Sequence, residues 1–342
     1  MSSGLSVDAV DGPGGEEKPP EDPEAPQQLA GRSPTRIALG RLARDKVAVV
    51  GTVVLLILVV LAIMAPLICD WWNIYPDQKD PNAPTPSQML DGNQLPSFGP
   101  PQYPFTWDHP LGIEPQSGRD NLALLLYGLR TSLTVALLAT VFSTVVGVTL
   151  GLLAGYAKGA VDAVLSFVID FFLSFPFILG ALALAPIITS RFGGDQDTLR
   201  RAELLSLVGI LVLFGWMGLA RLIRGQVLSL REREFVQAAQ VIGVPTWQIL
   251  FKELLPNLVA PIVVAISLSI PAYVAAEAGL SFLGIGLTES PSLGKTVNSA
   301  VNYFERYPLY LWTPVVTIMI MVIALNLVGD SIRDAFDPKT RR

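Results

Sequence analysis

The sequence has little of what most metal, redox and catalytic sites are built from. Its 342 residues include one cysteine, Cys69, and one histidine, His109. A single cysteine excludes a disulfide within the chain, and the two residues together form no His/Cys cluster with metal-ligand spacing. The sequence also lacks the G-x-S-x-G segment of many hydrolases. We therefore predict no catalytic residue and no metal site.

Charge is also scarce. Charged residues make up 15% of the chain and hydrophobic residues 51%, with a mean hydropathy of +0.49, whereas about a quarter of a soluble domain is charged. The apolar residues are gathered in long blocks, each long enough to cross about 30 Å of hydrocarbon as a helix. The chain is therefore predicted to be an all-α integral membrane protein. Its six transmembrane helices are expected at residues 47–69, 131–156, 162–189, 204–220, 258–283 and 311–328.

The ends of the chain set the expected topology. Residues 1–31 carry seven acidic residues and one lysine, and five basic residues follow between 32 and 46. Basic residues before a first span favour a cytoplasmic N-terminus, and six spans then return the C-terminus to the same side. No basic field remains for nucleic acid.

The expected organisation follows from these spans. It consists of a disordered acidic cytoplasmic tail (1–31), a basic segment with the first span (32–69), an extracytoplasmic segment (70–120), a five-helix core (121–335) and a cytoplasmic C-terminal end (336–342).

Three acidic residues fall in or near the spans. Asp170 lies about eight residues into the third span, where a charge must face protein or water. Structural pairing is favoured over a proton relay, because no acidic or histidine partner is evident. Glu277 is expected near the outer interface and Asp330 near the inner one, so that water reaches both. The glycines at every fourth position, Gly147, Gly151 and Gly155, predict a close helix contact.

Gly294-Lys295-Thr296 resembles the end of a phosphate-binding loop only superficially. The first glycine of that motif would stand at position 289, which is Glu289, and no strand precedes it. Nucleotide binding by this chain is therefore not expected.

Residues 232–257 form the most polar long segment among the spans. Phe235, Ala238, Ala239 and Ile242 predict one apolar helix face, and Gly243 ends that helix. A second helix starts at Pro245, with Trp247, Leu250, Phe251 and Leu254 on its apolar face, and ends at Pro256. Such a pair either lies flat on the inner leaflet or docks into a groove of a soluble partner.

The run Gln237-Ala238-Ala239, then Gly243, then Leu254-Leu255-Pro256-Asn257, resembles the EAA loop of bacterial ABC importer permeases. The resemblance implies a type I importer permease whose coupling helices, at about 229–257, dock into ATP-hydrolysing subunits. Gln237 stands where the motif has glutamate. The residues implied in ATPase coupling are Glu234, Phe235, Gln237, Ala238, Ala239, Gly243, Trp247, Leu255 and Pro256.

Further segments are similar to the permeases of dipeptide, oligopeptide and nickel importers. They include His109-Pro-Leu-Gly112 with Gly118-Arg-Asp120, Phe175-Pro176-Phe177 after Asp170, and Glu277 to Gly284. The acidic tail and an insertion at 71–107 depart from that pattern.

This resemblance implies a peptide-importing subunit of the bacterial inner membrane that binds no cofactor itself. Its implied partners are a second permease, two ATPase subunits that hold ATP and Mg, and an extracytoplasmic binding protein. Import of nickel or another small solute is an alternative. So are a proton-coupled secondary transporter that uses Asp170 and a membrane scaffold that uses the tail.

Overall fold

The computed structural model describes residues 40, 42–76, 86–97, 107–189, 196–287 and 290–336. The predicted tail (1–31), residues 77–85 and 98–106 of the insertion, and residues 337–342 lie outside this part. Within it the structure is helical, with two isolated β-bridges and no strand. Five helical stretches are long and apolar enough to cross a membrane, and a bent pair of helices makes a sixth.

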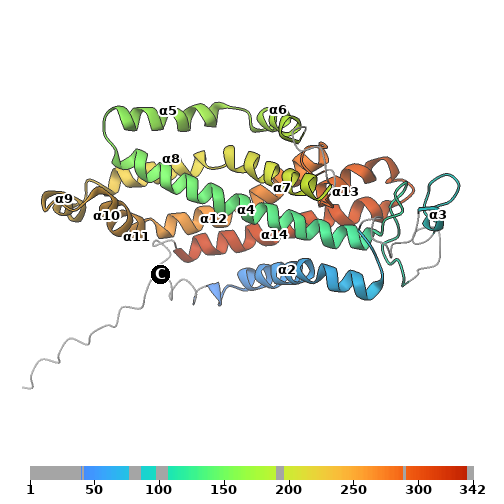
Figure 1. Cartoon of the computed structure of the whole chain (residues 1–342). Helices are drawn as coiled ribbons and strands as arrows, with labels where there is room; N and C mark the ends of the chain where they lie inside the picture. The colour runs from blue at the N-terminus through green and yellow to red at the C-terminus, as the bar shows by residue number, and fades with distance from the viewer. Residues whose placement is uncertain are drawn as a thin grey trace, which may run out of the picture.

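The long helices lie side by side in one bundle (Figure 1). They are α2 (Lys46–Trp72), α4 (Asn121–Tyr156), α7 (Gln196–Leu213) with α8 (Met217–Leu230), α12 (Val259–Phe282) and α14 (Pro308–Phe336). An aspartate is the N-cap of α2 and another is the N-cap of α4. Asp45 accepts the Val47 N–H at 2.9 Å, and Asp120 accepts those of Leu122 and Ala123. These caps satisfy donors that a helix start leaves unpaired. The second span thus begins about ten residues before the predicted position 131.

Helix α4 packs most closely on α8. A Cβ atom added at Gly147 would lie 2.8 Å from the Trp216 carbonyl oxygen, and one at Gly155 would lie 2.6 Å from Cβ of Val227. Gly151 faces the Ala220 carbonyl oxygen in the same way, at 2.7 Å. The backbones can approach this closely because these positions carry no side chain.

The third span is broken, so the prediction of one continuous helix over 162–189 is wrong. Helices α5 (Ala160–Ser174) and α6 (Phe177–Thr189) meet at 88°. Phe175 between them is extended, with φ −83° and ψ 128°. Pro176 explains the break, because its ring disfavours helical backbone at the preceding residue and it has no N–H to donate.

The fourth span is longer than predicted. Helical structure continues from Thr198 to Leu230 with a short irregularity at 214–216. Arg221 and Arg224 therefore lie within α8, beyond the predicted end of the span at residue 220. At the irregularity Gly215 leaves room for the ring of Tyr273, whose hydroxyl donates to Ser143 on α4 at 2.7 Å. This contact joins three helices.

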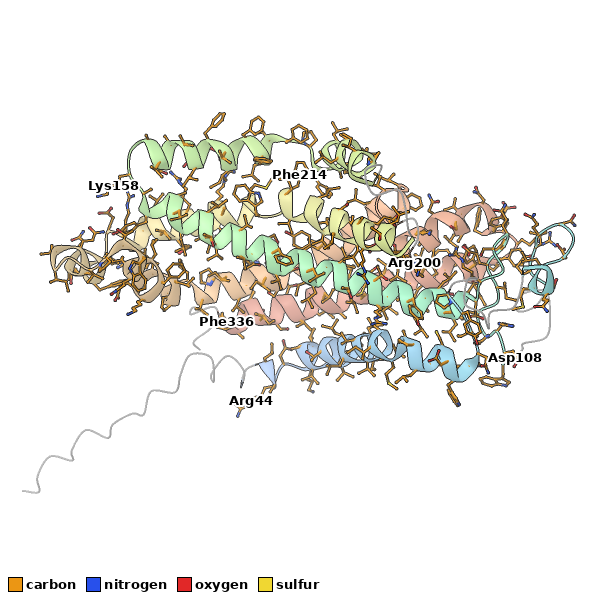
Figure 2. All side chains as sticks on the ribbon, in the orientation of Figure 1. Arg44, Asp108, Lys158, Arg200, Phe214 and Phe336 are labelled. Atoms are coloured by element: carbon orange, nitrogen blue, oxygen red, sulfur yellow. The ribbon has the colours of Figure 1, made fainter. Side chains whose placement is uncertain are left out.

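The bundle has two distinct ends, here called the α9 end and the α3 end. Helices α9 (Glu234–Val241), α10 (Thr246–Gln248) and α11 (Leu255–Asn257) lie at the first, and α3 (Pro86–Met89) and α13 (Leu293–Ala300) at the second (Figure 1). Arg44, Lys158 and Phe336 lie toward the α9 end, and Asp108 and Arg200 toward the α3 end (Figure 2). Helix α2 thus starts, and α14 finishes, at the α9 end.

Candidate partner-binding surface at the α9 end

A tight turn closes helix α9. Gly243 has φ +80°, a left-handed conformation that glycine adopts without a Cβ penalty. The Val244 N–H donates to the Ala239 carbonyl at 3.0 Å, and the Gly243 N–H donates to that of Gln240 at 3.1 Å. These two bonds form the Schellman pattern that satisfies the last carbonyls of a helix. The helix ends at the glycine, where the sequence places its end.

Helix α9 rests on α8 with one face. Val236 and Ala239 are buried and join a cluster with Ile223 and Val227 of α8. Phe235, Ala238 and Ile242, which the sequence grouped with Ala239 on one apolar face for a membrane or a partner, are exposed. The predicted face is thus divided, because Ala239 packs on α8 and the other three residues remain at the surface.

The second helix does not end at Pro256. After α10 comes a π-helix, η1 (Ile249–Leu254), and then α11, which leads at once into α12. Pro256 lies in the first turn of α11, where a missing N–H costs no helical hydrogen bond. Leu255 is half-buried. The segment is thus almost continuous with the following span, a connection that proline in the sequence argued against.

Buried side chains hold this second segment to the bundle, and aromatic rings remain outside. Ile249, Leu250 and Leu254 are buried in the same cluster as Val236. Trp247 and Phe251, which the sequence placed on the apolar face of this helix, are exposed. The Lys252 ammonium lies 5.9 Å from the centroid of the Trp247 ring, within cation–π range.

Polar contacts fasten α9 to the end of α4. Gln240 donates to the Tyr156 hydroxyl at 3.3 Å, and Arg231 donates to the Gly155 carbonyl at 3.2 Å. Gln237, which replaces the motif glutamate, donates to the Glu232 carbonyl at 3.3 Å. Glu234 is exposed in the first turn of α9. A cavity of about 910 Å³ opens between α9 and the α4–α5 connection.

An apolar surface remains uncovered at this end. We call it the α9 patch. Val241 is 86% exposed and Ile242 is 78% exposed. Charged residues of both signs, including Arg233, Glu234 and Lys252, lie around it in the sequence. Exposed apolar patches with a polar rim mark protein-binding surfaces. The members of the patch are Phe235, Ala238, Val241, Ile242, Trp247 and Phe251.

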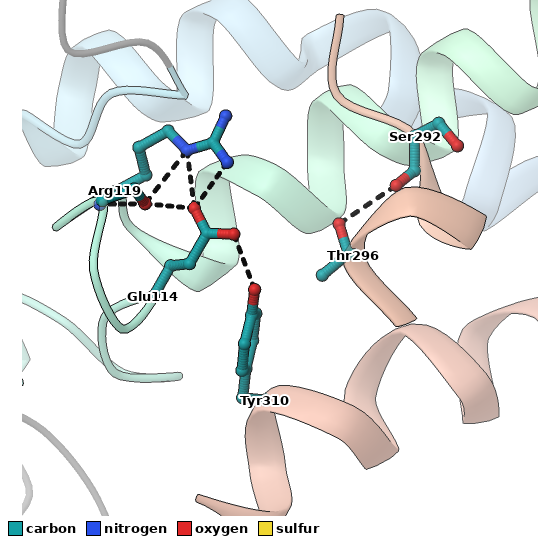
Figure 3. A network of polar contacts seen from close by, with 6 residues as sticks. Glu114, Arg119, Ser292, Thr296 and Tyr310 are labelled. Atoms are coloured by element: carbon teal, nitrogen blue, oxygen red, sulfur yellow. Dashed lines mark hydrogen bonds and ion pairs between the residues drawn. The ribbon is translucent and has the colours of Figure 1, made fainter. Parts of the chain in front are cut away.

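The α3 end carries a network of polar contacts instead. Glu114 is buried and pairs with the Arg119 guanidinium at 2.6 Å, while the Tyr310 hydroxyl of α14 donates to its other oxygen at 2.6 Å (Figure 3). Ser117 also donates to Glu114. His109 lies 2.8 Å from Asp120, the cap of α4. The segments 109–112 and 118–120, singled out in the sequence, thus meet in space and fasten the loop to α4 and α14.

The three acidic residues of the spans have different surroundings. Asp170 pairs with Arg221 at 2.5 Å, a structural partner of the kind that the sequence favoured. Asp330 is exposed near the finish of α14. Glu277 has no exposed surface, so the expectation that water reaches it is wrong. Its carboxylate accepts from Ser281 at 2.8 Å.

Helix α13 accounts for the burial of Glu277. It folds back against the part of α12 nearest the α3 end, and its Gly294 meets the Ala278 backbone. The segment that superficially resembles a phosphate-binding loop is therefore a packing contact between two helices. In the part of the chain that the structure describes, no group of three or more His, Cys, Asp or Glu residues has metal-binding geometry.

Known proteins are similar to this chain in sequence and in fold. Residues 147–342 match the family described as binding-protein-dependent transport system inner membrane component, and residues 33–94 match the N-terminal TM domain of oligopeptide transport permease C. The dipeptide transport system permease protein DppC of Alkalihalophilus pseudofirmus is 33% identical over 94% of this chain and 95% of its own length. The oligopeptide transport system permease protein OppC of Escherichia coli K12 is 33% identical over 92% of this chain and 94% of its own length.

A solved structure has a similar fold. An inward-facing conformation of the MetNI methionine ABC transporter aligns with a TM-score of 0.51 at 21% identity, covering 63% of this chain and 96% of that one.

Proposed function

Because the chain belongs to the family of binding-protein-dependent transport system inner membrane components, we propose that it is a permease subunit of an ATP-driven peptide importer. Relatives that align with nearly its whole length are dipeptide and oligopeptide transport permeases. The match to the N-terminal domain of oligopeptide transport permease C extends the likeness to the first span. Short peptides are therefore the proposed cargo.

The uncovered α9 patch is the observation that supports coupling to ATPase subunits. An importer subunit without ATPase chemistry of its own needs a surface on which a motor acts. The patch supplies apolar side chains to fill a groove, and its rim offers both charge signs. The partners would then hold ATP and Mg. This chain would change conformation when they do so, and thereby open and close the passage.

The connection behind the patch suits transmission of movement by packing. Val236 of α9 and Leu254 of η1 share one buried cluster with Ile223 of α8. Because η1 and α11 lead directly into α12, a displacement of the patch would tilt α8 and α12 together. Two-state rigid-body motions of this kind link nucleotide binding to alternating access.

The proposed assembly contains a second, similar permease, two ATPase subunits and an extracytoplasmic binding protein. In it the α9 end faces the cytoplasm, with both termini, and the α3 end faces outward. Four basic residues between 32 and 44 precede α2, and a fifth, Lys46, is its first residue; they favour this orientation.

Pairing of Asp170 with Arg221 argues against a stand-alone proton-coupled transporter. The Arg221 guanidinium holds this carboxylate at 2.5 Å, which is the structural pairing that the sequence favoured over a proton relay.

Reconstitution tests the proposed function directly. The complex of both permeases, the ATPases and the binding protein, placed in vesicles, should accumulate a labelled dipeptide only when ATP is present. A complex that lacks this chain is the control. Uptake that continues without ATP and follows a proton gradient would contradict the proposal, and so would uptake of nickel in place of peptide.

A further inference from the structure

Helix α5 carries a polar stripe along its length. Its 15 residues include four polar side chains, Asp162, Ser166, Asp170 and Ser174, and all the others are apolar. The four stand at every fourth position, so successive members are rotated by about 40° around the helix axis. They therefore share one side. Ser166 donates to Asp162 at 3.1 Å, and Ser174 donates to the Asp170 carbonyl at 2.8 Å.

Two arginines of α8 bind the two aspartates of this stripe. Arg221 Nη2 lies 2.5 Å from Asp170 Oδ1, and Arg224 Nη2 lies 2.9 Å from Asp162 Oδ1. Beside these pairs α5 packs on the bundle through apolar residues, because Ile169 is buried in a cluster with Met217 and Ala220 of α8. The stripe and the two arginines form a charged face next to this apolar contact, here called the α5–α8 face, although both helices belong to membrane spans.

The Asp170–Arg221 pair lies well inside helices that are long and apolar enough to cross a membrane. Asp170 comes ten residues after the first residue of α5, and Arg221 comes nine residues before the last residue of α8. At 1.5 Å per residue both positions are about 15 Å from the α9 end of their helices. The two positions are therefore level with each other, at a distance from the helix ends that is about half of a 30 Å hydrocarbon core.

The pair is nevertheless open. The side chains of Arg221 and Asp170 are 60% and 61% exposed. Charges at this depth cannot face lipid without a cost of several kcal/mol, so they face water or protein. Next to them α8 presents Gly218 and Gly225, where an added Cβ would meet no other atom within 4 Å. The face is therefore polar and leaves room beside it.

We propose that the α5–α8 face lines the aqueous passage of the transporter, and that Asp170 and Arg221 contact the charged ends of a zwitterionic peptide. This inference rests on the proposed function. A peptide carries an ammonium group at one end and a carboxylate at the other. Asp170 can accept from the first and Arg221 can donate to the second, each exchanging its partner for one of the same charge. Because the pair is neutral, it neither traps a net cation nor repels a net anion.

Thiol labelling tests whether the face is wet. In the assembled complex, with Cys69→Ala as background, Ser174→Cys places a thiol on the stripe four residues from Asp170. Val164→Cys is the matched control, because Val164 is also exposed but lies on another side of α5. The account predicts that membrane-impermeant methanethiosulfonates modify Ser174→Cys at least tenfold faster. Equal rates, or a quantitative crosslink of Ser174→Cys to the second permease, would overturn it.

Labelling with a cationic and an anionic thiol reagent tests whether Asp170 and Arg221 set the electrostatic potential in the passage. Side chains four residues apart on a helix are about 6 Å apart, where one unit charge in water changes a local ion concentration about threefold. With Asp170→Asn the trimethylammonium reagent should react about threefold more slowly at Ser174→Cys, and the sulfonate reagent about threefold faster. Their ratio then changes about tenfold. Arg221→Gln should shift it the other way, and an unchanged ratio contradicts the proposal.

Transport separates passage lining from a structural role. With Asp170→Asn, we expect the number of dipeptides moved per ATP hydrolysed to fall about fivefold, while binding-protein-stimulated hydrolysis stays within about twofold. Should the single variant fail to assemble, the reversed pair Asp170→Arg with Arg221→Asp keeps the contact and should invert the reagent ratio. An unchanged dipeptide-to-ATP ratio refutes the peptide contact. Normal ATP-driven peptide uptake with an unlabelled stripe would refute this inference alone and leave the proposed function standing.

Discussion

At the α3 end of the bundle polar side chains satisfy one another, whereas at the α9 end apolar side chains remain exposed. Glu114, Arg119 and Tyr310 form a largely buried network that is complete within the chain. Val241 and Phe251 have no such cover. Buried polar groups cost free energy unless they are paired, and exposed apolar groups gain free energy when a partner covers them. The Glu114 network is thus complete within the chain, whereas the α9 patch leaves apolar surface that we propose a partner covers.

The largest effect is expected where the α3 network is broken. Glu114→Ala leaves Arg119 and the Tyr310 hydroxyl without their shared acceptor, which should lower the free energy of unfolding by about 3–5 kcal/mol. Denaturant titration of the purified complex in mixed micelles measures this. Glu305→Ala, at an exposed carboxylate just before α14, is the control and should change it by less than about 0.5 kcal/mol. Equal effects of the two would mean that the network is not structural.

The α9 patch should behave in the opposite way. Phe251→Ser removes an exposed ring, so the stability of the chain itself should hardly change. Affinity for the ATPase subunits should fall about tenfold to a hundredfold, because covering a phenyl ring contributes about 1.5–3 kcal/mol. Subunit retention in pull-downs at graded ATPase concentration measures the loss. Phe304→Ser, an exposed ring far along the chain from the patch, should leave retention unchanged.

A smaller effect is expected at the turn that sets the direction of α9. Gly243→Ala forces a side chain into a left-handed conformation, at a cost of about 1–2 kcal/mol. Because the cost falls on the turn, binding-protein-stimulated ATP hydrolysis should drop while the spans still insert. Gly243→Asp, or a bulky residue at Ala239, should abolish transport. Gly279→Ala on α12 adds the same methyl group where nothing lies within 4 Å and should be neutral. Stimulated hydrolysis equal in both variants would contradict this.

The smallest effect concerns the start of α2. Hydrogen bonds from the Ser331 hydroxyl and the Val47 N–H lower the pKa of Asp45 below its usual value. A lowered folded-state pKa adds stability that is complete above the ordinary pKa, about 3.9, and is lost as pH falls through the folded value. Thermal unfolding of the wild type should therefore lose more between pH 6 and pH 3 than that of Asp45→Asn. An identical loss in both would show that this contact is not linked to pH.

Much of the fold follows from the sequence because hydrophobic length and glycine spacing are local signals. Such local signals predicted the spans around α2, α12 and α14. They also predicted the close contact that α4 makes through its glycines. The break at Phe175-Pro176 was visible as a dipeptide. The hydrophobic run from 162 to 189 led to the prediction of one continuous span. Proline restricts the backbone of the preceding residue however hydrophobic the segment is, so the helix breaks there.

The features that the sequence did not predict depend on contacts between segments that are distant in the chain. Which face of α9 is buried depends on where it meets α8, and a two-turn helix has several apolar residues on each side. Burial of Glu277 depends on α13, which lies about twenty residues later in the chain and covers it. Val236 and Ile249 were missed for the same reason. Their burial follows from Ile223 and Val227, which a periodicity within 232–257 does not contain.

Crosslinking from the α9 patch is the most direct test of the central claim, that this surface is held by an ATP-hydrolysing partner. A photoreactive residue in place of Val241, with one in place of the exposed Ile63 on α2 as control, would be activated in the complete transporter with and without ATP. The account predicts that Val241 crosslinks to the ATPase subunit in both states, with a yield that changes on ATP binding, while Ile63 does not crosslink to that subunit. Crosslinks from Val241 to lipid alone, in every state of the cycle, would contradict it.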